Sequence, residues 1–95
     1  MNQAPNVITP TARWAKSAKL NQICQAMIAD QAGCPSEIVK PDSKLVADLG
    51  MDSLDLIETC MAVEEEFEVM FKDEEAERCA TVGDIMDLVV LKGGV

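Results

Sequence analysis

Apolar residues along the chain recur at spacings of three and four, which is the repeat of a helix with one buried face. A Gly33-x-Pro35 stop follows the first such stretch, and Thr81 with Asp84 three residues later has the spacing of a capping box. The pattern predicts helices over residues 11–31, 52–68, 73–78 and 81–93. No segment alternates apolar and polar residues as a strand does. We therefore predict an all-α fold, a small bundle of three main helices plus one short helix.

The length of 95 residues allows one domain. Residues 1–10 contain two prolines and no periodic pattern, so we expect a flexible N-terminal arm followed by a helical domain over residues 11–95. The connection over residues 32–51 is long for a loop without apolar anchors. We expect Leu45, Val46 and Leu49 to attach it to the core.

The predicted second helix has two apolar faces. At about 100° per residue, one narrow stripe faces the core, and a second strip lies more than about 100° away from it. The core stripe contains Leu56, Cys60, Val63 and Phe67, with Thr59 at its edge. The outward strip contains Leu54, Ile57 and Met61, and it is bordered by Glu58, Glu64, Glu65 and Glu68. The helix thus has a core face and a separate apolar strip surrounded by carboxylates.

Charge is distributed unevenly along the chain. The 17 acidic and 8 basic residues give a net charge of −9, and residues 48–95 hold fourteen acids against three bases. Nucleic acids and anionic membranes select positive surfaces, so we expect neither as a partner. The three aromatic residues are too few for a base-stacking platform.

The sequence contains no pattern that indicates a metal site or a disulfide. The chain has no histidine, no C-x-x-C pair and no calcium-loop pattern, so we expect no metal site. The first ten residues do not resemble a signal peptide, and no apolar run is long enough to span a membrane. We therefore expect a cytoplasmic protein without membrane insertion, whose four cysteines are free thiols.

One serine stands out for its surroundings. Ser53 lies within Leu49-Gly50-Met51-Asp52-Ser53-Leu54, at the start of the predicted second helix. Taken alone, Asp52 or Ser53 could simply cap that helix. However, a helix N-terminus also favours a phosphate ester, and the acid-bordered strip follows directly. Because no histidine is available to activate the serine, an external enzyme must modify it. This pattern indicates a substrate or carrier rather than an enzyme.

The motif, together with DLIETCMAVEEEFEV and DEEAERCATVGDIMDLV that follow it, resembles the acyl carrier proteins over roughly residues 20–90. The resemblance implies that a separate phosphopantetheinyl transferase attaches phosphopantetheine from coenzyme A to Ser53, and that Asp52 and Leu54 help it to recognise the site. The thiol of this arm would carry acyl intermediates as thioesters for fatty-acid or polyketide-type synthesis. Acyl-transferring and chain-elongating synthases with basic docking surfaces would bind Asp55, Ile57, Glu58, Met61 and Glu65. The acyl chain would lie near Leu56, Val63, Phe71, Ala76, Cys79 and Met86.

Two other functions fit parts of the same pattern. A peptidyl or aminoacyl carrier would use the same serine for an amino acid. An unmodified acidic interaction module would present the same strip to a basic partner, with Ser53 left free. Modification of Ser53 distinguishes this module from the carriers. The strip is too small to require a homodimer, and we expect a monomer.

Overall fold

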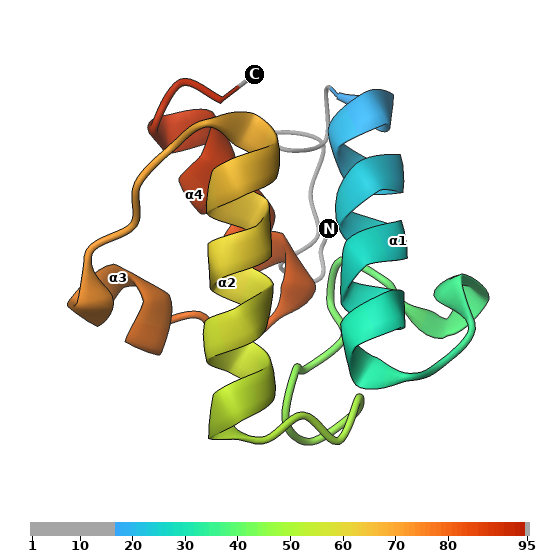
Figure 1. The fold of residues 1–95 in the computed structure, drawn as a ribbon. Coiled ribbons are helices and arrows are strands. Elements are labelled where there is room, and N and C mark those ends of the chain that lie inside the picture. Colours follow the sequence, from blue (N-terminus) through green and yellow to red (C-terminus); the bar gives the residue numbers. More distant parts are fainter. Residues whose placement is uncertain (1–16, 95) are drawn as a thin grey trace, which may run out of the picture.

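The computed structural model describes residues 17–94, which form a helical bundle (Figure 1). The elements are α1 (Ala18–Ala32), the 3-10 turn η2 (Ser36–Ile38), α2 (Ser53–Phe67), α3 (Asp73–Glu77) and α4 (Val82–Leu91). Helix packing joins α1 to both α2 and α4, and α2 to α4. The described residues contain no strand and only one isolated antiparallel bridge, between Lys44 and Thr81. The predicted all-α bundle of three main helices and one short helix is confirmed.

The first helix starts later than predicted. Ser17 has an extended backbone, and its hydroxyl accepts a hydrogen bond from the Leu20 backbone N–H at 3.1 Å. Because this N-cap satisfies a free N–H group, α1 begins at Ala18 rather than at residue 11. At its end, Gly33 takes a left-handed conformation with φ of 73°, as expected for a helix-terminating glycine. The predicted arm over residues 1–10 and the part of the predicted first helix over residues 11–16 lie outside the described residues.

The long connection between α1 and α2 is attached to the core by a partly different set of side chains than predicted. Leu45 is buried and Leu49 is half-buried, as expected, but Val46 is 60% exposed and the prediction for it is wrong. Val39 and Met51 are the further buried anchors. The Leu45 N–H donates to the Ala80 carbonyl at 2.9 Å, so the connection is also tied to the residues before α4.

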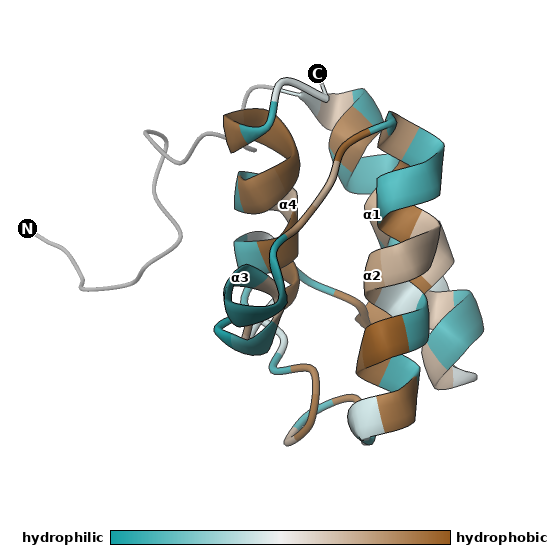
Figure 2. Ribbon diagram, turned by 60° about the vertical axis from the view of Figure 1, so that its left-hand side comes forward, coloured by the Kyte–Doolittle hydropathy of each residue, from teal (hydrophilic) through white to brown (hydrophobic). Residues whose placement is uncertain are grey.

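The core lies between α1, α2 and α4. Val82, Ile85, Met86 and Val89 of α4 are all buried, and α1 buries one side of its surface. Figure 2 shows the contrast between the largely apolar α4 and the hydrophilic α3, in which no residue is fully buried. The fully buried apolar side chains are Leu20, Cys24, Ile28, Leu45, Val63, Ile85, Met86 and Val89, with Val39, Met51 and Val82 close to full burial.

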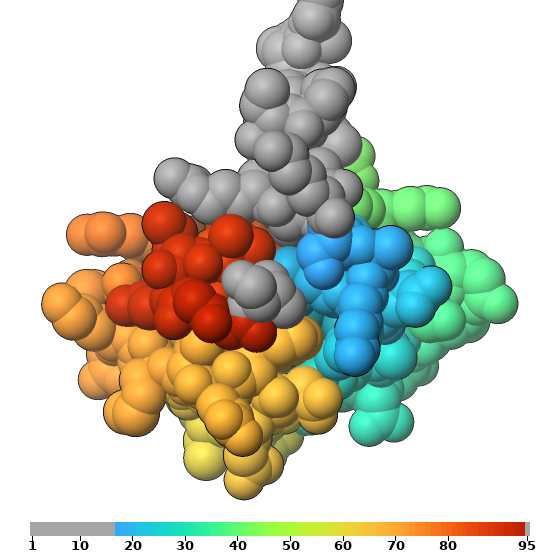
Figure 3. Space-filling view, turned by 90° about the horizontal axis from the view of Figure 1, so that it is seen from above, coloured from blue at the N-terminus to red at the C-terminus, as the bar shows by residue number. Residues whose placement is uncertain are grey.

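The three long helices meet at one end of the molecule. Figure 3, seen from above, shows the start of α1 beside the ends of α2 and α4. Ser53 is the first residue of α2, so it lies at the opposite end of that helix. Within the described part of the chain, no helix combines the length and the apolar character needed to cross a membrane.

Candidate functional site

Ser53 occupies the first position of α2 and is exposed to solvent. The residue before it caps the helix: the Asp52 carboxylate accepts from the Asp55 N–H at 2.9 Å, and the Asp55 carboxylate accepts from the Asp52 N–H at 3.1 Å. This reciprocal capping box satisfies two backbone donors and places two negative charges at the positive end of the helix dipole. Asp52 is therefore the N-cap, and the Ser53 hydroxyl is not used for capping. It forms no hydrogen bond within residues 17–94.

A tight turn brings the chain to this serine. Gly50 has φ of 69°, a left-handed backbone conformation that residues with a β-carbon rarely adopt. The following residue, Met51, is 2% exposed and anchors the turn in the core. The Leu49-Gly50-Met51 segment thus fixes the start of α2 while its next three residues, Asp52, Ser53 and Leu54, remain exposed.

The outward face of α2 has the composition that the helical pattern predicts. Leu54, Ile57 and Met61 are 60%, 56% and 61% exposed, although each is a large apolar side chain. Glu58 and Glu65 are exposed, whereas Asp55 is half-buried and engaged in the capping box. These five predicted partner residues and Leu54 therefore follow one side of α2. Exposed apolar groups bordered by carboxylates suit a basic partner surface.

Glu64, the other acid predicted to border the strip, is less exposed than Glu58 and Glu65. It is half-buried, and its carboxylate accepts a hydrogen bond from the Phe71 backbone N–H at 2.7 Å. Phe71 itself is buried. Glu64 thus fastens the α2–α3 connection, and its carboxylate is less available to a partner than those of Glu58 and Glu65.

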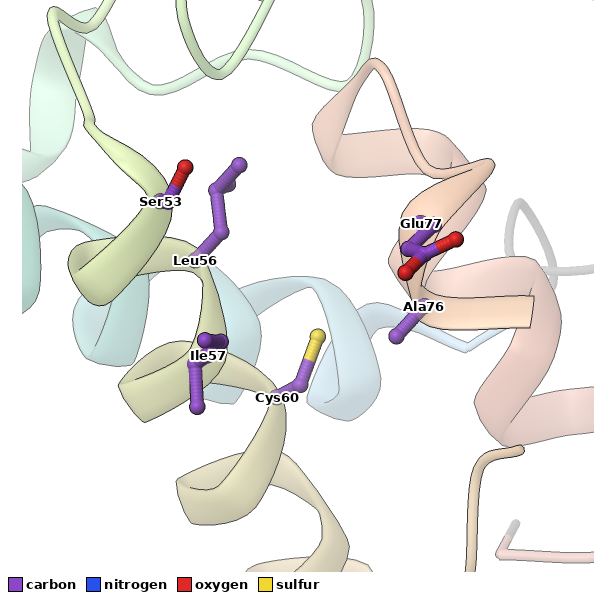
Figure 4. Close-up of a pocket in the computed structure, with 6 residues that line it drawn as sticks. All are labelled: Ser53, Leu56, Ile57, Cys60, Ala76 and Glu77. Atoms are coloured by element: carbon purple, nitrogen blue, oxygen red, sulfur yellow. The ribbon is translucent and has the colours of Figure 1, made fainter. Parts of the chain in front are cut away.

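A pocket of about 280 Å³ opens between α2 and α3, directly beside Ser53. Figure 4 shows the α2 side chains Ser53, Leu56, Ile57 and Cys60 on one side, and Ala76 and Glu77 of α3 on the other. Most of these side chains are apolar, and only the Ser53 hydroxyl and the Glu77 carboxylate are strongly polar. The pocket can hold a short aliphatic group that is attached at Ser53.

The six residues predicted to surround an acyl chain are dispersed. Leu56 and Ala76 line this pocket, whereas Cys79 lines a second hollow of about 300 Å³ between α3 and α4. Val63, Phe71 and Met86 are buried core residues and do not appear on the wall of either hollow. The pattern did not predict Cys60, Ile57 and Glu77 as lining residues. Cys60 and Ile57 could have been predicted, because their angular positions on the helix lie near that of Leu56.

The cysteine that shares the pocket with Ser53 is a poor acyl acceptor. All four cysteines are free thiols, and Cys60 lines the pocket. Burial raises the pKa of the Cys60 thiol, and the nearby Glu64 carboxylate raises it further. Burial also raises the pKa of Cys79 to about 12. Because the thiolate is the nucleophilic form, these raised pKa values lower the reactivity of both thiols at neutral pH.

Comparison with known proteins places this site in a family. The family model described as the phosphopantetheine attachment site matches residues 22–89, which include the Ser53 motif, the outward strip and the pocket. An acyl carrier protein of Clostridium acetobutylicum is 46% identical over 63 residues, covering 66% of this chain and 82% of that protein. Members of this family bear phosphopantetheine and act as carriers, not as catalysts. The chain therefore belongs to the acyl carrier protein family.

Proposed function

We propose that Ser53 is the residue that receives phosphopantetheine. The single observation that carries this proposal is its position: an exposed hydroxyl at the first residue of α2, beside an apolar pocket and free of the capping box. In the reaction, the Ser53 oxygen bonds to the phosphate that bears pantetheine, and the bond from that phosphate to the adenosine nucleotide of coenzyme A breaks. The resulting phosphodiester is covalent, so it needs no pre-formed phosphate site.

The activation of Ser53 comes from a separate phosphopantetheinyl transferase. The chain contains no histidine, and no described side chain accepts a hydrogen bond from the Ser53 hydroxyl. A general base must therefore be supplied by the partner. The exposed Asp52 and Leu54 on either side of the serine are suited to recognition by that enzyme.

We propose an aliphatic acyl cargo and a role in fatty-acid synthesis. The pocket beside Ser53 has walls made mainly of Leu56, Ile57, Cys60 and Ala76, which favour a hydrocarbon chain over a polar polyketide or an aminoacyl group. A longer acyl chain would contact the other predicted residues only if α3 moved. These residues are the buried Val63, Phe71 and Met86, and Cys79 in the second hollow. A fatty-acyl cargo therefore fits this pocket better than an amino acid does.

The proposed partners bind the exposed side of α2. Acyl-transferring and chain-elongating enzymes with basic docking surfaces would contact Asp55, Ile57, Glu58, Met61 and Glu65 in the cytoplasm. Exposed carboxylates mainly increase association rates and leave affinity modest, which suits a monomeric carrier that must leave each enzyme in turn.

The proposal is tested by intact mass before and after incubation with coenzyme A, magnesium and a broad-specificity phosphopantetheinyl transferase. We expect the wild-type chain to gain one phosphopantetheine and Ser53→Ala to gain none. Ser36→Ala is the matched control, because Ser36 is also an exposed serine near the start of a helical segment. Loading of Ser53→Ala, or failure to load the wild-type chain, would refute the assignment.

A second arm of this experiment tests the cargo. The chain is loaded with phosphopantetheine that bears either an octanoyl or an alanyl thioester, and the melting temperatures are compared with that of the unacylated form. A cargo that enters the pocket stabilises the protein, because the pocket exists in the folded state and not in the unfolded state. We expect octanoyl, and not alanyl, to raise the melting temperature. Equal effects of the two would contradict an aliphatic preference.

A further inference from the structure

Gln31 and Glu58 connect two helices at the exposed side of α2. The side-chain amide of Gln31 donates to the Glu58 carboxylate, with a distance of 2.6 Å between Nε2 and Oε1. Gln31 lies in the last turn of α1 and is half-buried, whereas Glu58 is exposed in the middle of α2. A hydrogen bond to a carboxylate is stronger than one between neutral groups. This contact therefore favours one orientation of the Glu58 side chain.

The restricted carboxylate occupies a central position in the outward strip. Glu58 follows Leu54 by four residues and precedes Met61 by three, so all three side chains share one face of α2. An exposed glutamate without such a contact loses side-chain entropy when a partner cation binds it. A donor that holds Glu58 in advance reduces this loss.

The end of α1 adds to the negative potential beside Glu58. The last turn of α1 contains no basic residue, and the helix ends at Ala32, the residue after Gln31. The C-terminal end of a helix dipole carries partial negative charge, and here no cation in the last turn neutralises it. A cationic group that approaches Glu58 thus also meets the negative end of α1.

We propose that the partner-binding surface extends from α2 onto the C-terminal end of α1, with Gln31 as the residue that positions Glu58 for an arginine or lysine of the partner enzyme. This inference rests on the proposed function, because it concerns the enzymes that load and use the carrier. Another glutamine of α1, Gln25, has a purely structural role. It donates to the Ser36 and Val39 carbonyls at 2.9 Å and so attaches the α1–α2 connection to α1. Gln31 instead bonds to an exposed carboxylate.

The test is a double-mutant cycle on the loading reaction. The full chain, Gln31→Ala, Glu58→Gln and the double variant are loaded by the phosphopantetheinyl transferase, and kcat and KM for the carrier are measured separately. We expect each single variant to raise KM about three-fold with kcat unchanged, as for an exposed charged contact. We expect the double variant to raise KM no further than Glu58→Gln alone.

Gln22→Ala is the matched control, because it removes an exposed glutamine from the same helix, away from Glu58. It should leave KM and the melting temperature unchanged. A KM of Gln31→Ala equal to that of Gln22→Ala, or single effects that multiply in the double variant, would overturn the inference. A wild-type chain that is not loaded at all would instead refute the assignment of Ser53, so the two failures are distinguishable.

Discussion

Thr59 is a polar residue in an apolar position. The helical pattern places it at the edge of the core stripe of α2, and the structure buries it to 2% exposure. Its hydroxyl oxygen has no hydrogen-bond partner in the described part of the chain. A buried hydroxyl without a partner costs about 1–3 kcal/mol of folding free energy. Thr59 therefore lowers the stability of the bundle without contributing to the exposed site.

We expect Thr59→Val to raise the free energy of unfolding by about 1 kcal/mol, because valine keeps the branched shape and removes the unpaired hydroxyl. Urea denaturation of both proteins measures the difference. Thr81→Val is the matched control: the Thr81 hydroxyl accepts from the Asp84 N–H and caps α4, so its loss should cost about 1 kcal/mol. No stabilisation by Thr59→Val would show that its hydroxyl is hydrogen-bonded in solution.

Some residues of the site could be placed from the sequence, and others could not. The exposure of Leu54, Ile57 and Met61 follows from the helical repeat, which depends only on neighbours along the chain. The burial of Glu64 depends on where Phe71 returns to α2, and the contact of Glu58 depends on the end of α1. Such contacts between distant segments are set by tertiary packing, which periodicity does not describe.

At the scale of the element, α2 ends in an unfavourable conformation. Its C-cap, Glu68, has φ of 56°, and it is the only described residue other than glycine with positive φ. The left-handed conformation costs a residue with a β-carbon about 1–2 kcal/mol. Glu68 also places a negative charge at the negative end of the helix dipole.

Glu68→Gly should therefore raise the free energy of unfolding by about 1 kcal/mol, since glycine adopts this conformation at little cost. Thermal unfolding followed by circular dichroism measures the change. Glu66→Gly makes the same substitution two residues earlier, inside α2, and should destabilise the protein by about 1 kcal/mol. If both variants were destabilised, the left-handed end of α2 would be ruled out as a source of strain.

The starts of the helices show which sequence signals are sufficient to predict a helix boundary. α2 and α4 begin where Asp52 and Thr81 cap them, because capping depends on residues three positions apart. The start of α1 differs from the prediction because Ser17 caps the helix, and apolar spacing alone does not mark that cap. In the connection to α2, Val39 and Met51 are buried by contacts with distant helices, and no local pattern marks them.

For the whole molecule, the net charge of −9 should limit stability. Most acidic side chains of the second half are exposed, and the described residues contain one ion pair, between Lys92 and Glu75 at 2.9 Å. Mutual repulsion of unpaired carboxylates opposes the compact state and is screened by salt.

We expect the melting temperature to rise when sodium chloride is increased from about 0.01 M to about 0.5 M, as the Debye length shortens. Differential scanning calorimetry measures the shift. Potassium chloride should give the same rise, because screening depends on ionic strength and not on the identity of the cation. A lower melting temperature at high salt would contradict the repulsion.

The weak attachment of α3 has a consequence for the pocket beside Ser53. This five-residue helix has no fully buried side chain, separates the two hollows, and is fastened by the Glu64–Phe71 hydrogen bond before it and by the Glu75–Lys92 ion pair. Segments with few buried contacts open at a smaller free-energy cost than the core. The volume of the pocket therefore varies as α3 moves, and acyl chains of different lengths would select different conformations of α3.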